Sequence, residues 1–188
     1  MSRPVRPRHA ASLVLLRREA AGPTVLMGRR PAKSRFAPDV FVFPGGKVDA
    51  ADFDQPSASP LAADCIRRAA AEPRLAAALA TAAIRETAEE TGLILPADHG
   101  ALSVAARAIT PTNSPVRFHA RFFLADADRA VGEAAETPEL SDLAWRPLDE
   151  ALKLPLYDIT EAVLRMLQQS APPFLMTYRA GRTLVTSL

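Results

Sequence analysis

Short apolar runs, separated by polar or turn-forming residues, predict that strands make up much of this chain. The runs lie near 11–17, 23–28, 40–43, 101–109, 117–125 and 142–146. Bounded apolar runs of this kind are typical of buried strands. Two further segments, 174–178 and 183–185, flank Gly181 and predict a hairpin.

Two helical patterns occupy the region after residue 60. One covers 61–71, and the second begins at Leu75 and continues into the acidic segment that follows. The many alanines on either side of Pro73 are strong helix formers, so we interpret this stretch as helical and not as low-complexity sequence.

A further helix is predicted near the end of the sequence. Asp158 and Glu161 are spaced as in a capping box, in which two side chains satisfy the first backbone donors of a helix. This helix is expected to run through Gln169. No internal repeat or linker interrupts the pattern, so we expect a single domain over residues 1–188.

The segment 84–93 holds three acidic residues that share one helix face. Glu86, Glu89 and Glu90 stand at i, i+3 and i+4. Residues at four-residue spacing on another face are apolar: Ala80, Ile84 and Ala88. Gly92 is a typical helix stop. Clustered glutamates usually form a solvated face, but like charges this close repel, and a bound divalent cation would remove that penalty.

A pair of glycines follows the apolar run 40–43. The sequence here is Phe43-Pro44-Gly45-Gly46-Lys47. We predict a turn at the glycines, because residues without a side chain let the backbone approach a ligand or metal closely. A glycine loop that is followed by an acidic helix indicates a metal site more strongly than either feature does alone.

Together these segments resemble the box of the Nudix hydrolase family: Gly, five residues, Glu, seven residues, then Arg-Glu-U-X-Glu-Glu-X-Gly-U, where U is apolar. Matching positions are Gly46, Arg85, Glu86, Glu89, Glu90, Gly92 and Leu93. Asp52 stands at the first Glu position and Thr87 at the first apolar position of the second half. Residues 53–84 replace the family's seven, an insertion of 25 residues, and we expect 53–80 to form a helical insertion within the box.

The insertion and the Phe-Pro-Gly-Gly sequence resemble the coenzyme A and acyl-coenzyme A diphosphatase branch of the family. Arg29 and Arg35 fall at the spacing of that branch's upstream signature, although Asp39 stands where the signature has Gly. The similarity covers roughly residues 10–150. Within this branch Arg29, Arg35 and Phe41 are the expected substrate-binding residues, and Phe36 is a second candidate for stacking on a base.

The resemblance implies an α+β Nudix fold, with a mixed sheet sandwiched between helices in an α/β/α arrangement. It also implies a metal site of Glu86, Glu89, Glu90 and the Gly46 carbonyl, holding Mg²⁺ or Mn²⁺. Arg85, Glu86 and Glu89 are the expected catalytic residues, with Glu86 or Glu89 as general base. Glu139 is a candidate extra acid, as are its neighbours Glu136 and Asp142.

The composition and charge of the chain bear on its cellular compartment and on the ligands that it could bind. The chain has 188 residues, one cysteine (Cys65) and no apolar run of membrane-spanning length, so we expect a cytoplasmic protein without intrachain disulfides. Residues 1–35 hold nine Arg or Lys and one Glu, a local charge of +8. This basic segment fits a diphosphate site, solvated strand ends or nucleic acid. His9, His99 and His119 lack the spacing of a zinc site.

Two functions of different class remain. The first is metal-dependent hydrolysis of a nucleoside diphosphate linked to another moiety, with coenzyme A or acyl-coenzyme A as the leading substrate and ADP-ribose, NADH or dinucleoside polyphosphates as alternatives. The second is a non-catalytic Nudix module that binds a nucleotide and regulates a partner. The expected partner is a small nucleotide diphosphate substrate. Nucleic acid and membranes are not expected, and a homodimer is an open alternative to a monomer.

Overall fold

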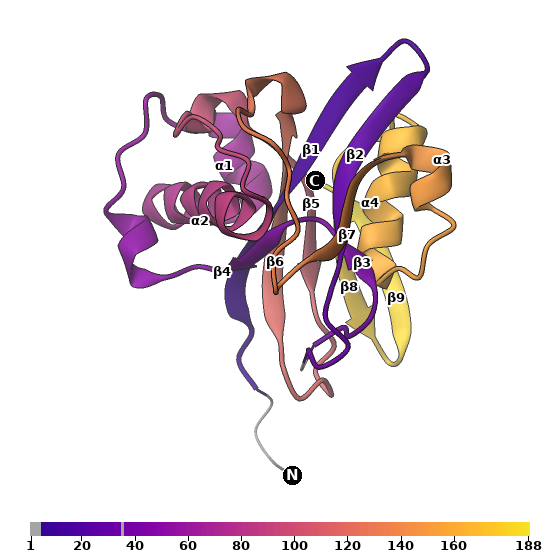
Figure 1. Ribbon diagram of the computed structural model, residues 1–188. Coiled ribbons are helices and arrows are strands. Elements are labelled where there is room, and N and C mark those ends of the chain that lie inside the picture. Colours follow the sequence, from indigo (N-terminus) through magenta and orange to yellow (C-terminus); the bar gives the residue numbers. More distant parts are fainter. Residues whose placement is uncertain (1–4, 35) are drawn as a thin grey trace.

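A nine-stranded mixed sheet forms the centre of the computed structural model, which describes residues 5–34 and 36–188 (Figure 1). The order is β3-β2-β1-β6-β5-β8-β9, with β4 beside β1 and β7 beside β2. The strands are β1 (Arg8–Glu19), β2 (Gly22–Arg29), β3 (Phe41–Val42), β4 (Gly45–Lys47), β5 (Ser103–Ile109), β6 (Phe118–Asp126), β7 (Ser141–Pro147), β8 (Phe174–Arg179) and β9 (Arg182–Ser187).

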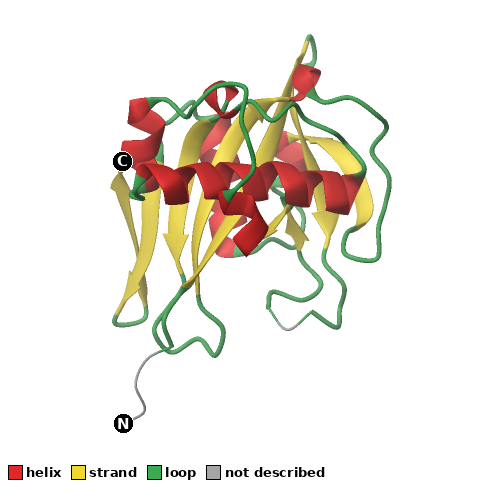
Figure 2. Cartoon of the chain, turned by 90° about the vertical axis from the view of Figure 1, so that its left-hand side faces the viewer, coloured by secondary structure: helices red, strands yellow, loops and turns green. Residues whose placement is uncertain are grey.

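Helices cover both faces of this sheet. In the described part of the chain they are α1 (Ala63–Ala69), α2 (Pro73–Thr91), α3 (Leu148–Ala151) and α4 (Asp158–Gln168). Figure 1 shows α1 and α2 on one side of the strands and α3 and α4 on the other, and Figure 2 shows α2 crossing the sheet. The α/β/α arrangement predicted from the sequence is therefore confirmed.

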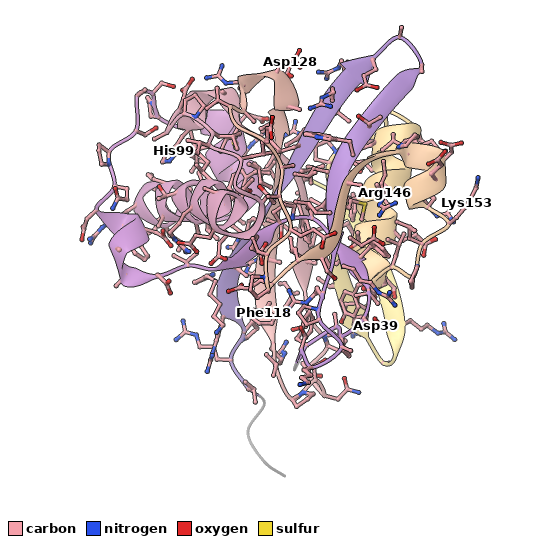
Figure 3. All side chains as sticks on the ribbon, in the orientation of Figure 1. Asp39, His99, Phe118, Asp128, Arg146 and Lys153 are labelled. Carbon is pink, nitrogen blue, oxygen red and sulfur yellow. The ribbon has the colours of Figure 1, made fainter. Side chains whose placement is uncertain are left out.

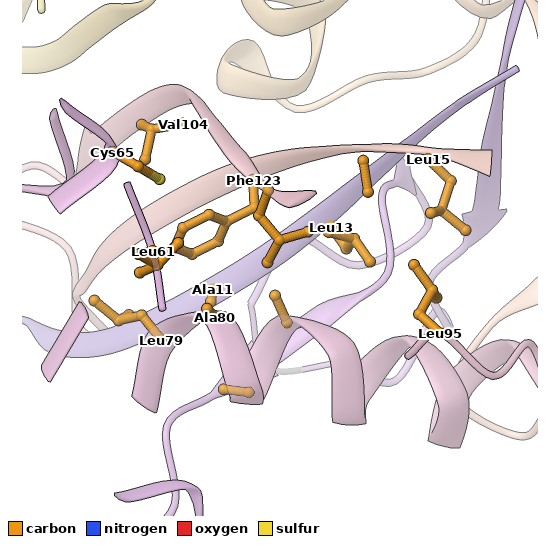
Figure 4. Close-up of a cluster of buried hydrophobic side chains, with 14 of the residues drawn as sticks. Ala11, Leu13, Leu15, Leu61, Cys65, Leu79, Ala80, Leu95, Val104 and Phe123 are labelled. Atoms are coloured by element: carbon orange, nitrogen blue, oxygen red, sulfur yellow. The ribbon is translucent and has the colours of Figure 1, made fainter. Parts of the chain in front are cut away.

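Strand β1 is the centre of the sheet and has apolar side chains on both faces. It pairs in parallel with β6 and antiparallel with both β2 and β4. Leu13 and Leu15 pack toward α2, whereas Val14 and Leu16 pack toward α4. A strand buried on both faces has a continuous apolar run in place of alternation. Figure 4 shows the α2 side of this core around Leu13 and Phe123.

Residues 53–80, expected to be helical, begin as a largely exposed loop and become helical only from Ala63, where they pack against the sheet. The segment supplies α1 and the first turns of α2, and its Leu61, Cys65 and Leu79 belong to the core. At the end of α1, the Arg121 guanidinium on β6 donates a hydrogen bond to the Ala69 carbonyl at 3.0 Å. This contact satisfies one of the last carbonyls of α1, which otherwise lack helical partners.

Several predicted boundaries are wrong in detail. Helix α2 begins at Pro73 and not at Leu75, because proline fits the first turn of a helix, where its missing N–H costs no bond. Strand β5 begins at Ser103, after a short 3-10 helix over His99–Ala101. The predicted hairpin is confirmed as β8 and β9.

The capping box predicted for the last helix is also wrong. Tyr157 precedes the first turn of α4, without a side-chain cap. The carboxylate of Asp158 instead accepts from the Ile159 amide and from the Tyr178 hydroxyl, and Glu161 pairs with Arg165. Asp158 therefore bonds a distant residue, Tyr178, and Glu161 bonds Arg165 on the same helix face, in place of the capping bonds that their spacing indicates.

Candidate active site

The second half of α2 places the acidic residues of the box. Its inner face packs on the sheet through small side chains: Ala76, Ala80 and Ala83. Thr87, which departs from the apolar pattern, is fully buried, and its hydroxyl donates to the Ala83 carbonyl at 2.7 Å. That internal bond satisfies the polar group, so threonine is tolerated in the interior. Gly92 ends the helix with φ of 74°, which confirms the predicted stop.

The glycine pair lies in strand β4, so the prediction of a turn at these residues is wrong. Gly45 and Gly46 pair antiparallel with Ser12 and Ala11 of β1. A β-carbon at residue 45 would lie 2.5 Å from the Ala11 carbonyl oxygen, and one at residue 46 would lie 2.3 Å from the Glu86 carboxyl carbon. At Gly45 a side chain would meet the β1 backbone, and at Gly46 it would displace the Glu86 side chain, because β4 lies between β1 and α2.

A hydrogen bond joins β4 directly to the acidic helix. The Gly45 amide donates to Glu90 Oε2 at 2.8 Å. Glu90 has only 4% of its surface exposed, and burial raises the pKa of its carboxyl to about 7, with the neighbouring Glu86 acting in the same direction. Burial also raises the pKa of Glu86. Both shifts reflect carboxylates with too little solvent or positive charge around them.

Arg85 connects four acidic residues around this point. Its Nε and Nη2 donate to Asp52 Oδ1 and Oδ2 at 2.9 and 3.1 Å, and its Nη1 donates to Glu86 and Glu89 at 3.0 Å each. Asp49 Oδ2 is more distant, at 3.8 Å from Nη2. Asp52, although 33 residues before Arg85 in the sequence, is thus held beside the acidic helix as the partner of an arginine.

A cavity of about 420 Å³ opens beside β4. Its polar end is lined by Glu86, Glu90, Glu139, Arg30 and Lys47. Among the described residues, no three acidic, histidine or cysteine side chains already converge as a metal site. Glu89 turns outward, with 58% of its side chain exposed, toward Arg85. The cavity is therefore lined by four carboxylates, those of Asp49, Glu86, Glu90 and Glu139, and the carboxylate of Glu89 lies nearby.

The other end of the cavity is aromatic. Phe36 packs edge-on against Phe118 and Tyr157, with ring centroids 5.1 and 5.2 Å apart. Phe118 lies at the lower end of β6 in Figure 3. The remaining wall includes Phe122 and Tyr178, and small side chains such as Ala10 and Ala120 form the floor on the sheet. Such an end suits a flat or apolar group more than a charged one.

The predicted substrate-binding residues fall in different places. Arg29 pairs with Asp39 at 2.8 Å, and Phe41 is core, 4% exposed, beneath the Arg146 guanidinium. Neither lines the cavity, and Arg35 lies outside the described residues. Arg30 does line it, and its buried Nε has no hydrogen-bond partner among the described residues.

Of the acids that precede or open β7, only one reaches the cavity. Glu139 lines it and raises the pKa of both Glu86 and Glu90. Glu136 is exposed, and Asp142 pairs with Arg146 at 2.7 Å. Periodicity in this irregular segment carries no signal, so only the fold separates these three residues.

Comparisons with known proteins agree with this geometry. The NUDIX domain family model matches residues 6–167. No curated protein matches the chain. Among solved structures, a NUDIX hydrolase from Alicyclobacillus acidocaldarius is similar at 28% identity and a TM-score of 0.74, over 87% of this chain and 91% of that one.

Two more distant structures share the fold. The MutT protein from Bacillus halodurans has 16% identity and a TM-score of 0.60, over 95% of this chain and 97% of that one. The NUDIX domain of NrtR from Shewanella oneidensis, solved with ADP ribose, has 15% identity and a TM-score of 0.60, over 88% and 89%. The family match spans both strand β4 and the acidic helix. The chain therefore belongs to the NUDIX family and is a Nudix hydrolase, which acts on nucleoside diphosphate derivatives.

Proposed function

We propose that this enzyme hydrolyses the diphosphate linkage of a nucleotide conjugate at the polar end of the cavity, with coenzyme A or acyl-coenzyme A as the leading substrate. The observation that carries the proposal is the meeting of the β4 backbone with Glu86 and Glu90 beside a cavity that is polar at one end and aromatic at the other. A diphosphate fits the first end and a nucleotide base or apolar group fits the second.

Nudix hydrolases generally use divalent metal ions, and the residues present fit one. Glu86, Glu89 and Glu90 supply oxygen ligands, and the Gly46 carbonyl is the fourth donor in the proposal. The raised pKa values of Glu86 and Glu90 are those of carboxylates without an adequate counter-charge. Hard ions such as Mg²⁺ or Mn²⁺ prefer such ligands. When bound, the ion neutralises charge on diphosphate oxygens and activates a water molecule.

The chain's own residues perform the remaining tasks. Glu86 lines the cavity and is held by Arg85 at 3.0 Å, so we assign it as general base in preference to the outward-facing Glu89. Arg85 keeps the acidic helix and Asp52 in register. Arg30, with an unpartnered Nε in the cavity wall, takes the phosphate-binding role that the resemblance implied for Arg29, and the role expected of Arg35 stays a prediction.

The aromatic end of the cavity is proposed to bind the part of the substrate beyond the diphosphate. We assign base stacking to Phe36, because it lines the cavity, and not to Phe41, which is in the core. The resemblance of the Phe-Pro-Gly-Gly segment and the insertion to the coenzyme A branch favours a coenzyme A derivative. ADP-ribose, NADH and dinucleoside polyphosphates remain the alternatives within the same mechanism.

A nucleotide-binding regulator is the second candidate. Its supporting observation is that Glu89 is engaged by Arg85 and not turned into the cavity. Against it stands the cost of burying Glu90 and Glu86 side by side, which a binding module has no need to bear. A cytoplasmic setting, a small-molecule partner and an open choice between monomer and homodimer belong to the same proposal.

Product analysis by mass spectrometry tests the substrate assignment. The purified enzyme is incubated with Mg²⁺ in heavy-oxygen water and offered coenzyme A, acetyl-coenzyme A, ADP-ribose, NADH and diadenosine polyphosphates in parallel. We expect 4'-phosphopantetheine and adenosine 3',5'-bisphosphate from coenzyme A, with the heavy oxygen in one of the two phosphates. Faster cleavage of another panel member would replace the coenzyme A assignment and keep the mechanism. Tight binding without any cleavage would favour the regulator.

A further inference from the structure

Four basic side chains from three neighbouring strands gather on the sheet face that carries α1. His9 of β1 lies directly opposite His119 of β6, and Arg121 of β6 lies directly opposite Arg107 of β5. The two imidazole centroids are 6.1 Å apart. Because strand residues alternate between faces, the adjoining Ala10 and Ala120 line the reaction cavity on the other side of the sheet. The cluster is thus separated from the cavity by the sheet.

Hydrogen bonds fix the tautomers of both histidines. Arg121 Nη1 lies 3.0 Å from His9 Nδ1, and Arg107 Nε and Nη2 each lie 3.3 Å from His119 Nε2. A guanidinium has only donors, so each of these ring nitrogens must be the unprotonated acceptor. The proton of each neutral ring is then on its other nitrogen: Nε2 of His9 and Nδ1 of His119. The cluster therefore presents N–H groups and positive charge.

No carboxylate contacts this cluster among the described residues. Arg121 gives its other hydrogen bonds to the Ala69 and His119 carbonyls, and the bonds found for Arg107 go only to His119. Residues 1–4 and 35 contain no Asp or Glu. Burial and the neighbouring guanidiniums lower the pKa of His119 to about 3 and also lower that of His9. Buried arginines normally have an anionic partner, so the missing charge is the anomaly.

We propose that Arg107, His119 and His9 form a binding site for a phosphate dianion, distinct from the reaction cavity. Access is available because His9 is exposed, and His119 and Arg107 are partly exposed. Arg121, only 1% exposed, is a positioning residue: it holds the His9 ring and is itself anchored on the His119 backbone carbonyl. A phosphate has several acceptor oxygens and supplies the negative charge that the cluster lacks.

Two sources provide this chemistry: free inorganic phosphate and the phosphate of a phosphomonoester. Near neutral pH a phosphomonoester is mainly dianionic and inorganic phosphate is a mixture of monoanion and dianion, and phosphomonoesters are the product class of diphosphate hydrolysis. The site itself does not depend on the proposed function, because it is defined by residues outside the cavity. The experiment therefore uses metal-free enzyme and treats the two sources as separate arms.

The test follows the imidazole signals of the protein by nuclear magnetic resonance, with His9→Gln and His119→Gln used for assignment. The enzyme is titrated with inorganic phosphate in one arm and adenosine monophosphate in the other, and with chloride at matched ionic strength as the control. We expect saturable shifts of both His9 and His119 and a rise in the pKa of His119 on phosphate binding. Saturation by adenosine monophosphate as well would identify phosphomonoesters as a second source.

Variants locate the binding. Arg107→Gln is expected to weaken the phosphate response of His119 at least about tenfold, a loss of about 1.4 kcal/mol. Arg30→Gln, in the cavity, is expected to leave that response unchanged. If Arg107→Gln does not fold, His9→Gln replaces it, because that ring is exposed. Shifts that chloride reproduces, no saturation by either anion, or equal affinity in Arg107→Gln would overturn the proposal.

Discussion

Arg85 donates two parallel hydrogen bonds, of 2.9 and 3.1 Å, to the carboxylate of Asp52, which lies 33 residues earlier in the sequence. Asp52 is 2% exposed, and its Oδ2 also accepts from the Asp49 amide at 2.7 Å. The pair closes the chain around the segment that contains α1 and fixes the guanidinium that holds Glu86. Asp52 therefore acts on the site through Arg85 and not as a ligand of its own.

Removing this carboxylate is expected to destabilise the protein. Asp52→Asn leaves Arg85 partly uncompensated, and we predict a loss of about 2–4 kcal/mol in the free energy of unfolding, measured by urea denaturation. Asp49→Asn is the matched control, because Asp49 is 3.8 Å from Arg85 and its side chain is 69% exposed. The control is expected to change stability by less than about 0.5 kcal/mol. Equal effects of the two substitutions would show that the Asp52 pairing is unimportant.

Alanine substitutions at the two adjacent glycines are expected to affect different properties, stability at Gly45 and activity at Gly46. At Gly45 an added methyl meets the β1 backbone, so Gly45→Ala is predicted to lower stability by at least about 2 kcal/mol. At Gly46 it meets only the end of the Glu86 side chain, which can rotate away. Gly46→Ala is therefore predicted to fold but to lose about 100-fold in kcat, because Glu86 is displaced. Thermal melts and steady-state kinetics on both variants separate the effects; a Gly46→Ala enzyme with normal kcat contradicts the assignment of Glu86.

Phe36 and Phe41 provide a comparison between binding and packing. Phe36→Ala is predicted to raise KM about tenfold with a smaller change in kcat, in line with the ~1–3 kcal/mol of a base–aromatic stack. Phe41→Ala is predicted to cost about 3–5 kcal/mol of stability, because it empties a core site. Kinetics at a temperature where both variants are folded make the comparison. A larger KM effect from Phe41→Ala would return the stacking role to that residue.

Protonation of His119 is expected to contribute to the pH dependence of the free energy of unfolding. Its pKa is about 3 in the folded protein, mainly because of burial and then Arg121, against 6.5 as the ordinary value. Between these values the unfolded chain binds the proton and the folded chain does not, so the free energy of unfolding falls as pH falls from about 6.5 toward 3. His119→Gln removes that share. Urea denaturation from about pH 7 to pH 4 should therefore show a shallower loss in the variant; identical slopes would contradict the shifted pKa.

Local patterns predicted much of this architecture. The run Leu13–Leu16 indicated a buried strand, and the i, i+3, i+4 glutamates with Gly92 indicated the acidic end of α2. The helices on either side of residues 70–72 were also predicted, because alanine propensity is a local property. Each of these features depends on residues within a few positions of one another.

What escaped prediction depends on distant segments. The conformation of Gly45 and Gly46 is set by β1 and Glu90, so a local turn signal was misleading. Arg29 and Arg30 are neighbours in sequence, yet only the structure shows that Arg30 lines the cavity. The aromatic wall joins Phe36, Phe118 and Tyr157, which no sequence spacing relates.

In the proposed mechanism, Glu90 and its neighbours bind the metal on which hydrolysis depends. The most direct measurement is the rate of diphosphate hydrolysis against Mg²⁺ concentration for the wild-type enzyme and Glu90→Gln, with melting curves of both proteins. Glutamine is close in size and can still accept from the Gly45 amide, so the variant is expected to fold. We predict saturable Mg²⁺ dependence in the wild type and a loss of at least about 100-fold in kcat for the variant. Normal Mg²⁺-dependent turnover by folded Glu90→Gln would contradict the account.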